Sequence, residues 1–126
     1  MTNPNTNFTV LIIEDDFEVR SLIYDTLEHE KYRVLEAEDG EVGLALIHQE
    51  RPDIVLTDIR MPGIDGLDLI KAYRMIDKYV PIIAISGDPT SEQPAIKVGA
   101  TKFLHKPVRP DILLGLIASI ISEKAH

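Results

Sequence analysis

The sequence predicts an α/β fold, a doubly wound five-stranded parallel sheet with five helices. Two observations carry this prediction. Strand-like and helix-like segments alternate five times along the chain, as they do in an open parallel sheet wrapped by helices. The strand-like segments at 9–13 and 81–86 are apolar runs, which is typical of parallel strands that are buried on both faces.

The first half of the chain supplies three strands and two helices. The expected strands span residues 9–13, 33–36 and 53–57, and the third ends at Asp58. The first helix starts near Phe17 and carries one apolar stripe at helical spacing: Val19, Leu22, Ile23 and Leu27. Asp39-Gly40 opens a second helix, and Pro52 stops that region.

The second half supplies the remaining elements. Turn-forming residues at 61–66 lead into a third helix, followed by the strand at 81–86. A short fourth helix over 91–98 ends at Gly99, a favourable C-terminal cap. The fifth strand spans 101–105, and the last helix spans 110–123 with Pro110 in its first turn.

Length and composition are those of one domain. We expect a disordered lead at 1–7 and a single domain at 8–124 of the 126 residues. The chain has no cysteine, which fits a cytoplasmic location. No stretch approaches the ~20 apolar residues of a membrane span, and the net charge of −8 argues against direct nucleic-acid binding.

Reactive side chains follow four of the predicted strands. Glu14-Asp15-Asp16, Asp58, Ser86 and Lys106 all stand at or near strand ends, and ligands bind at that edge of a parallel sheet. Two carboxylates 4 Å apart repel by roughly 4 kcal/mol at an effective dielectric of 20. A site of oxygen ligands without His or Cys therefore favours a hard cation such as Mg²⁺.

A carboxylate can also act as a nucleophile toward phosphorus. Asp58 would take that role, with Lys106 and Ser86 contacting the phosphoryl oxygens. Each residue alone has an ordinary structural explanation, because a strand-end Asp is often a turn residue or a cap. Glu14 and Asp15 could likewise favour the first helix through its dipole. Their joint occurrence at the ends of four strands favours phosphoryl transfer.

The segments "VLIIEDD", "DIVLTDIRMPGIDGLDL", "PIIAISG" and "GATKFLHKPV" occur in this order. With these motifs the sequence resembles the receiver domain of response regulators, of which the chemotaxis receiver is the single-domain type. The resemblance runs from about Phe8 to Glu123. It implies a flavodoxin-like sheet with strand order 2-1-3-4-5. It also implies a two-component phosphorelay in which a sensor histidine kinase or a phosphotransfer protein phosphorylates Asp58.

The resemblance implies a role for each matched position. Asp58 is the phosphoacceptor, while Lys106 and Ser86 assist it. The Mg²⁺ ligands are Asp15, Asp58, the backbone carbonyl of Arg60 and, through water, Glu14. Ser86 and Phe103 form the switch, and the bond Lys106-Pro107 is cis.

Four positions carry features of their own. Glu14 stands where Asp is more usual, and Phe103 lacks the hydroxyl of the Tyr often found there. Arg60 and Asp88 have opposite charges, and we expect them to approach each other across the pocket mouth and slow hydrolysis. The alternative is that both are solvated, since exposed ion pairs contribute only about 0–1 kcal/mol.

The last helix carries a wide apolar arc, because Ile112 and Leu114 extend its core stripe sideways. The arc indicates either a deeply packed helix or a surface, with the fourth helix and fifth strand, for an unknown downstream protein or a homodimer. Both explanations stay open here. The chain is either a stand-alone protein or a portion of a larger regulator.

We expect the protein to be a phosphoacceptor signalling domain and not an enzyme, although it would support its own phosphotransfer and autodephosphorylation. A receiver-fold binding module that acts without phosphorylation is the main alternative. An aspartyl phosphohydrolase would need an acid where Arg60 stands. A flavin-binding protein would need a Ser/Thr/Gly-rich loop where this chain has Glu14-Asp15-Asp16.

Overall fold

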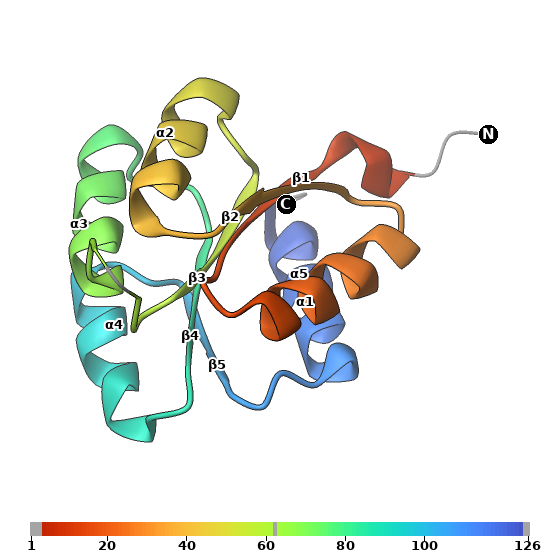
Figure 1. The fold of residues 1–126 in the computed structure, drawn as a ribbon. Coiled ribbons are helices and arrows are strands. Elements are labelled where there is room, and N and C mark those ends of the chain that lie inside the picture. Colours follow the sequence, from red (N-terminus) through yellow and green to blue (C-terminus); the bar gives the residue numbers. More distant parts are fainter. Residues whose placement is uncertain (1–3, 62, 125–126) are drawn as a thin grey trace.

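The computed structural model describes residues 4–61 and 63–124. Figure 1 shows a central sheet with helices on both sides. The sheet has the order β2-β1-β3-β4-β5, and every neighbouring pair is parallel. Its strands are β1 (Thr9–Ile13), β2 (Arg33–Ala37), β3 (Ile54–Asp58), β4 (Ile82–Ser86) and β5 (Lys102–His105). The order and the direction of the strands confirm the predicted fold.

Five helices cover the sheet. They are α1 (Phe17–His29), α2 (Gly40–Glu50), α3 (Gly66–Ile76), α4 (Glu92–Val98) and α5 (Pro110–Lys124). Helices α1 and α5 lie on one face, and α2, α3 and α4 lie on the other (Figure 1). Two short 3-10 turns, η1 (Pro4–Asn7) and η2 (Pro89–Ser91), precede β1 and α4.

The sheet separates two apolar cores. Ile23 of α1 and Ile117 of α5 pack with Leu56 of the sheet on one side. Ile47 of α2 and Leu69 of α3 pack with Val55 on the other side. Because alternate residues of a strand point to opposite faces, β3 contributes to both cores and is completely buried. This explains why the central strands β1, β3 and β4 are mostly apolar.

The predicted element ends differ from the observed ones by about one residue. The clearest case is β3, which was expected at 53–57 and spans Ile54–Asp58. Asp58 is therefore part of the sheet, where it lies in register with Ile85. The ladder fixes the position of this carboxylate more firmly than a loop would.

The start of the chain differs from the expected disorder. Residues 4–7 form η1, and the Asn5 side chain donates a hydrogen bond to the Glu30 carbonyl at 2.7 Å. The Phe8 amide donates to the Asn5 carbonyl, and the Phe8 ring packs against the first core. This anchoring gives 4–7 a defined turn, while residues 1–3 lie outside the described part of the chain.

Most of the apolar arc of α5 serves the core. Leu113, Ile117 and Ile120 are buried, and Leu114 packs partly against them. Ile112 differs, because 47% of its surface is exposed. In the described residues, no helix combines the length and the apolar character that crossing a membrane requires.

Candidate functional site

The carboxyl ends of β1, β3 and β4 open into a polar pocket of about 410 Å³. Most of the residues that the sequence singled out line it. They are Glu14, Asp15, Asp16, Asp58, Arg60, Ser86, Gly87, Asp88 and Lys106. The structure thus brings the predicted catalytic and metal-binding residues into one place. Their roles stay predictions.

Asp58 lies in the centre of this pocket. The residue is only 4% exposed, so few orientations are open to its carboxylate. One oxygen, Oδ1, accepts a hydrogen bond from the Arg60 amide at 3.1 Å, and the other, Oδ2, accepts one from Lys106 Nζ at 3.0 Å. Two donors therefore hold both oxygens at the open edge of the sheet.

Glu14 lies close to Asp58 and has no exposed surface. Its Oε1 accepts a hydrogen bond from Lys106 at 3.1 Å, whereas its Oε2 is buried without a hydrogen-bond partner among the described residues. Burial, followed by the proximity of Asp58, raises the pKa of Glu14 to about 8, although Lys106 opposes the shift. A buried carboxylate oxygen without a donor is costly, and it is also free to face a cation.

Asp15 and Asp16 follow Glu14, but only Asp15 belongs to the carboxylate cluster. Oxygens of Glu14, Asp15 and Asp58 lie within 4.8 Å of one another, so a single ion could contact all three side chains. Asp16 instead caps α1, because its Oδ1 accepts hydrogen bonds from the amides of Glu18 and Val19 at 2.9 and 3.2 Å. Asp16 was not expected to be a ligand, and its side chain is already used.

Lys106 supplies an ammonium group to the pocket. Its ammonium contacts both Glu14 and Asp58. Burial alone would lower the pKa of Lys106, but the hydrogen bonds and charges of Asp58 and Glu14 raise it above its usual value. The next peptide bond, Lys106-Pro107, is cis as the resemblance implied. Lys106 therefore stays charged and offsets one of the negative charges.

Ser86 is buried at the end of β4, and its Oγ accepts a hydrogen bond from the Asp88 amide at 3.0 Å. Arg60 and Asp88 meet at the pocket mouth as expected, with Arg60 Nη2 donating to Asp88 Oδ2 at 2.7 Å. The effect of this contact on hydrolysis stays a prediction.

Phe103 does not line the pocket. It is half-buried on β5, packs against the core under α2, α3 and α4, and meets the His105 ring edge-on with centroids 4.9 Å apart. His105 in turn lies 3.5 Å from Glu92 of α4. The expected switch residue is thus positioned beside α4, and its inward movement stays a prediction.

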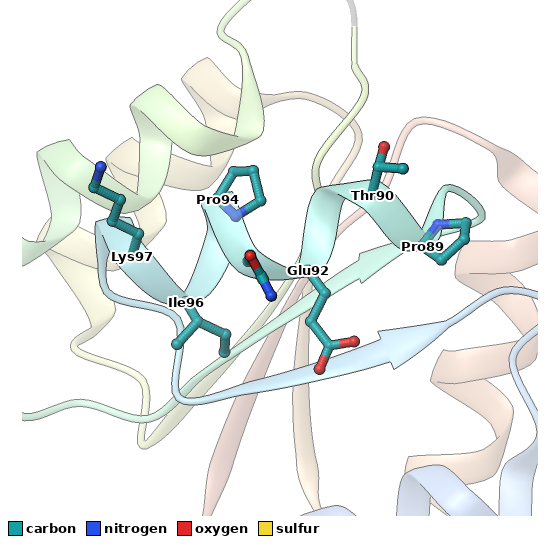
Figure 2. Close-up of a pocket in the computed structure, with 7 residues that line it drawn as sticks. Pro89, Thr90, Glu92, Pro94, Ile96 and Lys97 are labelled. Carbon is teal, nitrogen blue, oxygen red and sulfur yellow. The ribbon is translucent and has the colours of Figure 1, made fainter.

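A larger groove of about 930 Å³ runs along η2 and α4 (Figure 2). It is lined by Pro89, Thr90, Glu92, Gln93, Pro94, Ile96 and Lys97. None of these residues belongs to the carboxylate cluster, and the groove is open. We therefore place the chemistry in the smaller pocket around Asp58, and consider the groove as a surface.

The pocket suits a divalent cation. Its candidate ligands are carboxylate oxygens and a backbone carbonyl, which hard cations prefer. Three carboxylates face one ammonium, and Glu14 Oε2 has no donor. A cation there would relieve both the repulsion and the unpaired oxygen. The chemistry of the donor set therefore fits Mg²⁺.

The sequence analysis did not identify two residues that hold parts of the site in position, Arg20 and Thr90. Arg20 of α1 donates a hydrogen bond from Nη1 to the Glu14 carbonyl at 2.8 Å, which fixes the end of β1. Thr90 donates from both its amide and its hydroxyl to Asp88 Oδ1, at 2.9 and 2.7 Å. The spacing Asp-Pro-Thr resembles a capped turn and could have indicated the second contact. A single sequence contains no comparable signal for Arg20.

Comparisons with known proteins agree with this geometry. Residues 10–118 match the family model of the response regulator receiver domain. The chain is 28% identical over 122 residues to sporulation initiation phosphotransferase F of Bacillus subtilis, covering 95% of this chain and 98% of that protein. It is 36% identical over 118 residues to a probable transcriptional regulator, ycf27, of Guillardia theta, covering 92% of this chain. The chain spans 46% of that second relative's length.

Solved structures show the same fold. The chemotaxis protein CheY4 of Vibrio cholerae is 33% identical, with a TM-score of 0.84 and coverage of 89% of this chain and 97% of that one. A CheY-like receiver domain protein of Methanospirillum hungatei is 28% identical, with a TM-score of 0.88 and coverage of 94% and 96%. The match to the family model covers most of the chain and includes every residue of the pocket.

Proposed function

Because this chain belongs to the response regulator receiver domain family of two-component signalling, we propose that it accepts a phosphoryl group on Asp58. The donor would be a sensor histidine kinase or a phosphotransfer protein. One observation carries the proposal: the Asp58 carboxylate lies at the sheet edge between Lys106 and the Arg60 amide, within reach of two further acids.

Receiver domains generally depend on Mg²⁺, and the pocket has the ligands for it. Asp15, Asp58 and the Arg60 carbonyl would hold the ion directly, and Glu14 would do so through water. Bound Mg²⁺ would neutralise the oxygens of the incoming phosphoryl group.

The transfer itself needs few protein groups. A carboxylate oxygen of Asp58 forms a bond to phosphorus while the bond between phosphorus and the donor's imidazole nitrogen breaks, and the electron pair returns to that nitrogen. Lys106 and the Ser86 hydroxyl, which line the same pocket, would contact the phosphoryl oxygens. The same groups would support autodephosphorylation, in which water attacks phosphorus and releases phosphate.

We further propose that Arg60 and Asp88 slow this hydrolysis. Their 2.7 Å contact joins two residues that line the same pocket as Asp58. Water that approaches phosphorus opposite the Asp58 oxygen would have to pass this pair. Every opening of the pair costs only about 0–1 kcal/mol, because it is exposed, so the proposed effect is modest.

Phosphorylation would then change a partner-binding face. Ser86 and Phe103 would act as the switch, and the face would consist of α4, β5 and α5. Ile96 and Ile112, which are 45% and 47% exposed, give it an apolar part. The downstream partner would be a protein, or a second copy of this chain. Light scattering that shows a monomer both before and after phosphorylation would remove the homodimer.

We propose a cytoplasmic location, because the sequence has no cysteine and therefore no disulfide of the kind that oxidising compartments favour. In this proposal it binds neither nucleic acid nor membrane directly. It is a signalling domain, and the phosphoryl transfer described above is the chemistry it supports.

The test is to incubate the protein with acetyl phosphate and Mg²⁺ and to follow its intact mass. We expect a gain of one phosphoryl group, lost in Asp58→Asn and in the presence of a chelator. Asp111→Asn is the matched control, because Asp111 is an exposed acid in the first turn of α5, outside the pocket. No gain in the unmodified protein would reject the proposal and favour a binding module that acts without phosphorylation.

A further inference from the structure

Arg20 of α1 makes three contacts around the end of β1. Its Nη1 donates a hydrogen bond to the Glu14 carbonyl at 2.8 Å, and its Nε lies 3.6 Å from Glu36 Oε1 on β2. Its guanidinium carbon lies 5.6 Å from the centre of the Phe17 ring. Only 15% of the Arg20 side chain is exposed. A planar guanidinium can serve several such contacts at once, and Arg20 thus joins the first helix to the ends of two neighbouring strands.

The hydrogen bond to Glu14 acts on the backbone that leads into the carboxylate cluster. The Glu14 carbonyl belongs to the planar peptide unit that joins Glu14 to Asp15. The Glu14 amide, one peptide earlier, donates to the Ala37 carbonyl at 3.0 Å and so continues the ladder between β1 and β2 beyond Ile13. Arg20 fixes the next unit, for which the sheet offers no partner of this kind. The orientation of the peptide before Asp15 therefore depends on Arg20.

Asp15 needs this support more than its neighbours do. It is exposed, whereas Glu14 is held by complete burial. Asp16, on the other side, is held as the N-cap of α1. Carboxylate oxygens of Glu14, Asp15 and Asp58 nevertheless lie within 4.8 Å of one another. The backbone on either side of Asp15 therefore has to keep its carboxylate in the cluster.

Glu36 offsets the charge that Arg20 brings near this cluster. An unpaired guanidinium beside a cation site would repel the ion. The Glu36 carboxylate is 42% exposed, so its contact with Arg20 adds little to stability. Its consequence is electrostatic, because the pair lets Arg20 hold the loop without adding a net positive charge.

We propose that Arg20 is a positioning residue for the Mg²⁺ site, and that it keeps the Asp15 carboxylate aimed at the ion by fixing the peptide between Glu14 and Asp15. This inference rests on the proposed function and adds a residue that does not line the pocket. Arg20 would touch neither the ion nor the phosphoryl group. Groups that orient metal ligands commonly change the affinity for the metal by about 10–100-fold when they are removed.

NMR measures the affinity directly, without a phosphoryl donor. The amide shifts of residues 14–16 and 58–60, followed as Mg²⁺ is added, give the Kd for the ion. Arg20→Met keeps an unbranched apolar stem but has neither donor nor charge, and its Kd should be about ten-fold higher. Arg20→Lys keeps a donor and the charge but cannot serve Glu14 and Glu36 equally well, so its Kd should rise only about three-fold. If Arg20 acted only by repelling the ion, Arg20→Met would instead bind Mg²⁺ more tightly.

A second readout separates positioning of the ion from general damage to the pocket. Phosphoryl uptake from acetyl phosphate is measured by intact mass over a range of Mg²⁺ concentrations. In Arg20→Met the Mg²⁺ concentration that gives the half-maximal rate should rise about ten-fold. The rate at saturating Mg²⁺ should stay close to that of the unmodified protein, because Asp58 and Lys106 keep their contact.

Arg33→Met is the matched control. Arg33 also lies near a glutamate, with Nη2 3.8 Å from Glu50 Oε1, and it donates a hydrogen bond to the Thr9 hydroxyl at 3.3 Å. These contacts lie at the start of β1, at the opposite edge of the sheet from the pocket. The control removes the same charge and should leave the Kd for Mg²⁺ unchanged.

A Kd in Arg20→Met that equals or falls below that of the unmodified protein would overturn the proposal. A lower rate at saturating Mg²⁺ without any shift in the Mg²⁺ dependence would overturn it as well. The NMR spectrum shows whether Arg20→Met is folded, and if it is not, Arg20→Lys decides by the same criteria.

The two readouts also separate this proposal from the function on which it rests. Mg²⁺-dependent shifts without phosphoryl uptake in the unmodified protein would reject the phosphoacceptor role of Asp58, while the affinities of the variants would still decide the role of Arg20. Absence of Mg²⁺-dependent shifts in the unmodified protein would reject the magnesium site, and with it the role of Arg20.

Discussion

Glu14 shows how a single residue can be placed for function at the expense of stability. It is fully buried, shares Lys106 with Asp58 and has one oxygen without a hydrogen-bond partner. Such an arrangement destabilises the folded state unless a cation is present. Sites of this kind commonly trade stability for activity.

Replacing Glu14 with Gln tests this trade. We expect Glu14→Gln to raise the free energy of unfolding at pH 7 without Mg²⁺ by about 0.5–2 kcal/mol. Because its pKa is raised to about 8 in the folded state, Glu14 must take up a proton to fold at that pH, and Gln removes this cost. Adding Mg²⁺ should stabilise the unmodified protein more than the variant. Urea denaturation with and without the ion measures both effects. A variant that is less stable without Mg²⁺ would show that the carboxylate is not a source of strain.

The contact between Arg60 and Asp88 predicts a kinetic effect. Asp88→Ala should speed the loss of the phosphoryl group by up to about five-fold, because an exposed pair contributes at most about 1 kcal/mol. The decay of phosphorylated mass after removal of acetyl phosphate measures the rate. Asp111→Ala serves as the comparison, since it removes an exposed acid outside the pocket. Equal decay rates in the two variants would contradict the proposed role.

Residue types at the site and the contact between Arg60 and Asp88 were predictable, whereas most other contacts were not. The positions of Asp58, Ser86 and Lys106 followed from strand ends and from the resemblance. That Lys106 contacts Glu14 as well as Asp58 depends on how three strand ends converge. The several contacts of Asp88 likewise depend on the shape of a loop, which no periodicity reports.

At the scale of elements, the start of α3 packs closely against the end of β3, next to the site. A Cβ on Gly66 would lie 2.5 Å from both the Asp58 carbonyl and Ile59 Cα, which is closer than real contacts allow. The start of α3 therefore lies directly on the backbone of Asp58 and Ile59. Gly66 is required for this approach, and it also explains the turn that the sequence predicted there.

Two glycine-to-alanine variants separate close approach from helix propensity. Gly66→Ala should lower the free energy of unfolding by about 1–3 kcal/mol and slow phosphoryl uptake by displacing Asp58. Gly115→Ala, within α5, should raise it by about 0.5–1 kcal/mol, because an added Cβ meets no described atom within 4 Å. Urea denaturation compares both with the unmodified chain. A neutral Gly66→Ala would contradict the packing argument.

Element types were predicted well because each signal is local. Apolar runs and helical stripes predicted the five strands and five helices in the right order, and those ends that were predicted differ from the observed ends by about one residue. The turn at 4–7 was missed because its contacts are to Glu30 and Phe8, which a reading of local polarity does not reveal. The apolar arc of α5 left two explanations, and only packing showed that Leu114 belongs to the core while Ile112 is exposed.

At the scale of the whole molecule, two cores share one sheet, and stability depends on both. Tyr73 of α3 is among the largest fully buried side chains and lies in the core under α2, α3 and α4. Burial, followed by the charge of Asp77, raises the pKa of Tyr73 from its usual 10.0 to about 12. Alkaline pH therefore acts on the core itself.

The direction of this pH effect follows from the shift. Below pH 10 the hydroxyl is protonated in both the folded and the unfolded chain, and its stabilisation is fully present. Between pH 10 and about 12 the unfolded chain loses the proton first, so stability falls by roughly 2–3 kcal/mol. Tyr73→Phe should lose this part of the alkaline dependence, while Tyr79→Phe, at a side chain that is 90% exposed, should keep it. Urea denaturation across that range checks the difference.

The two contacts of Lys106 span 48 and 92 residues of sequence, and they join the fifth strand region to the first and the third. Contacts between such distant segments form late in folding, because long loops must close before they are rewarded. A nascent or half-folded chain would thus display Asp58 without its ammonium partner and would be a poor acceptor. Under the proposed function, only completely folded molecules would therefore accept a phosphoryl group efficiently.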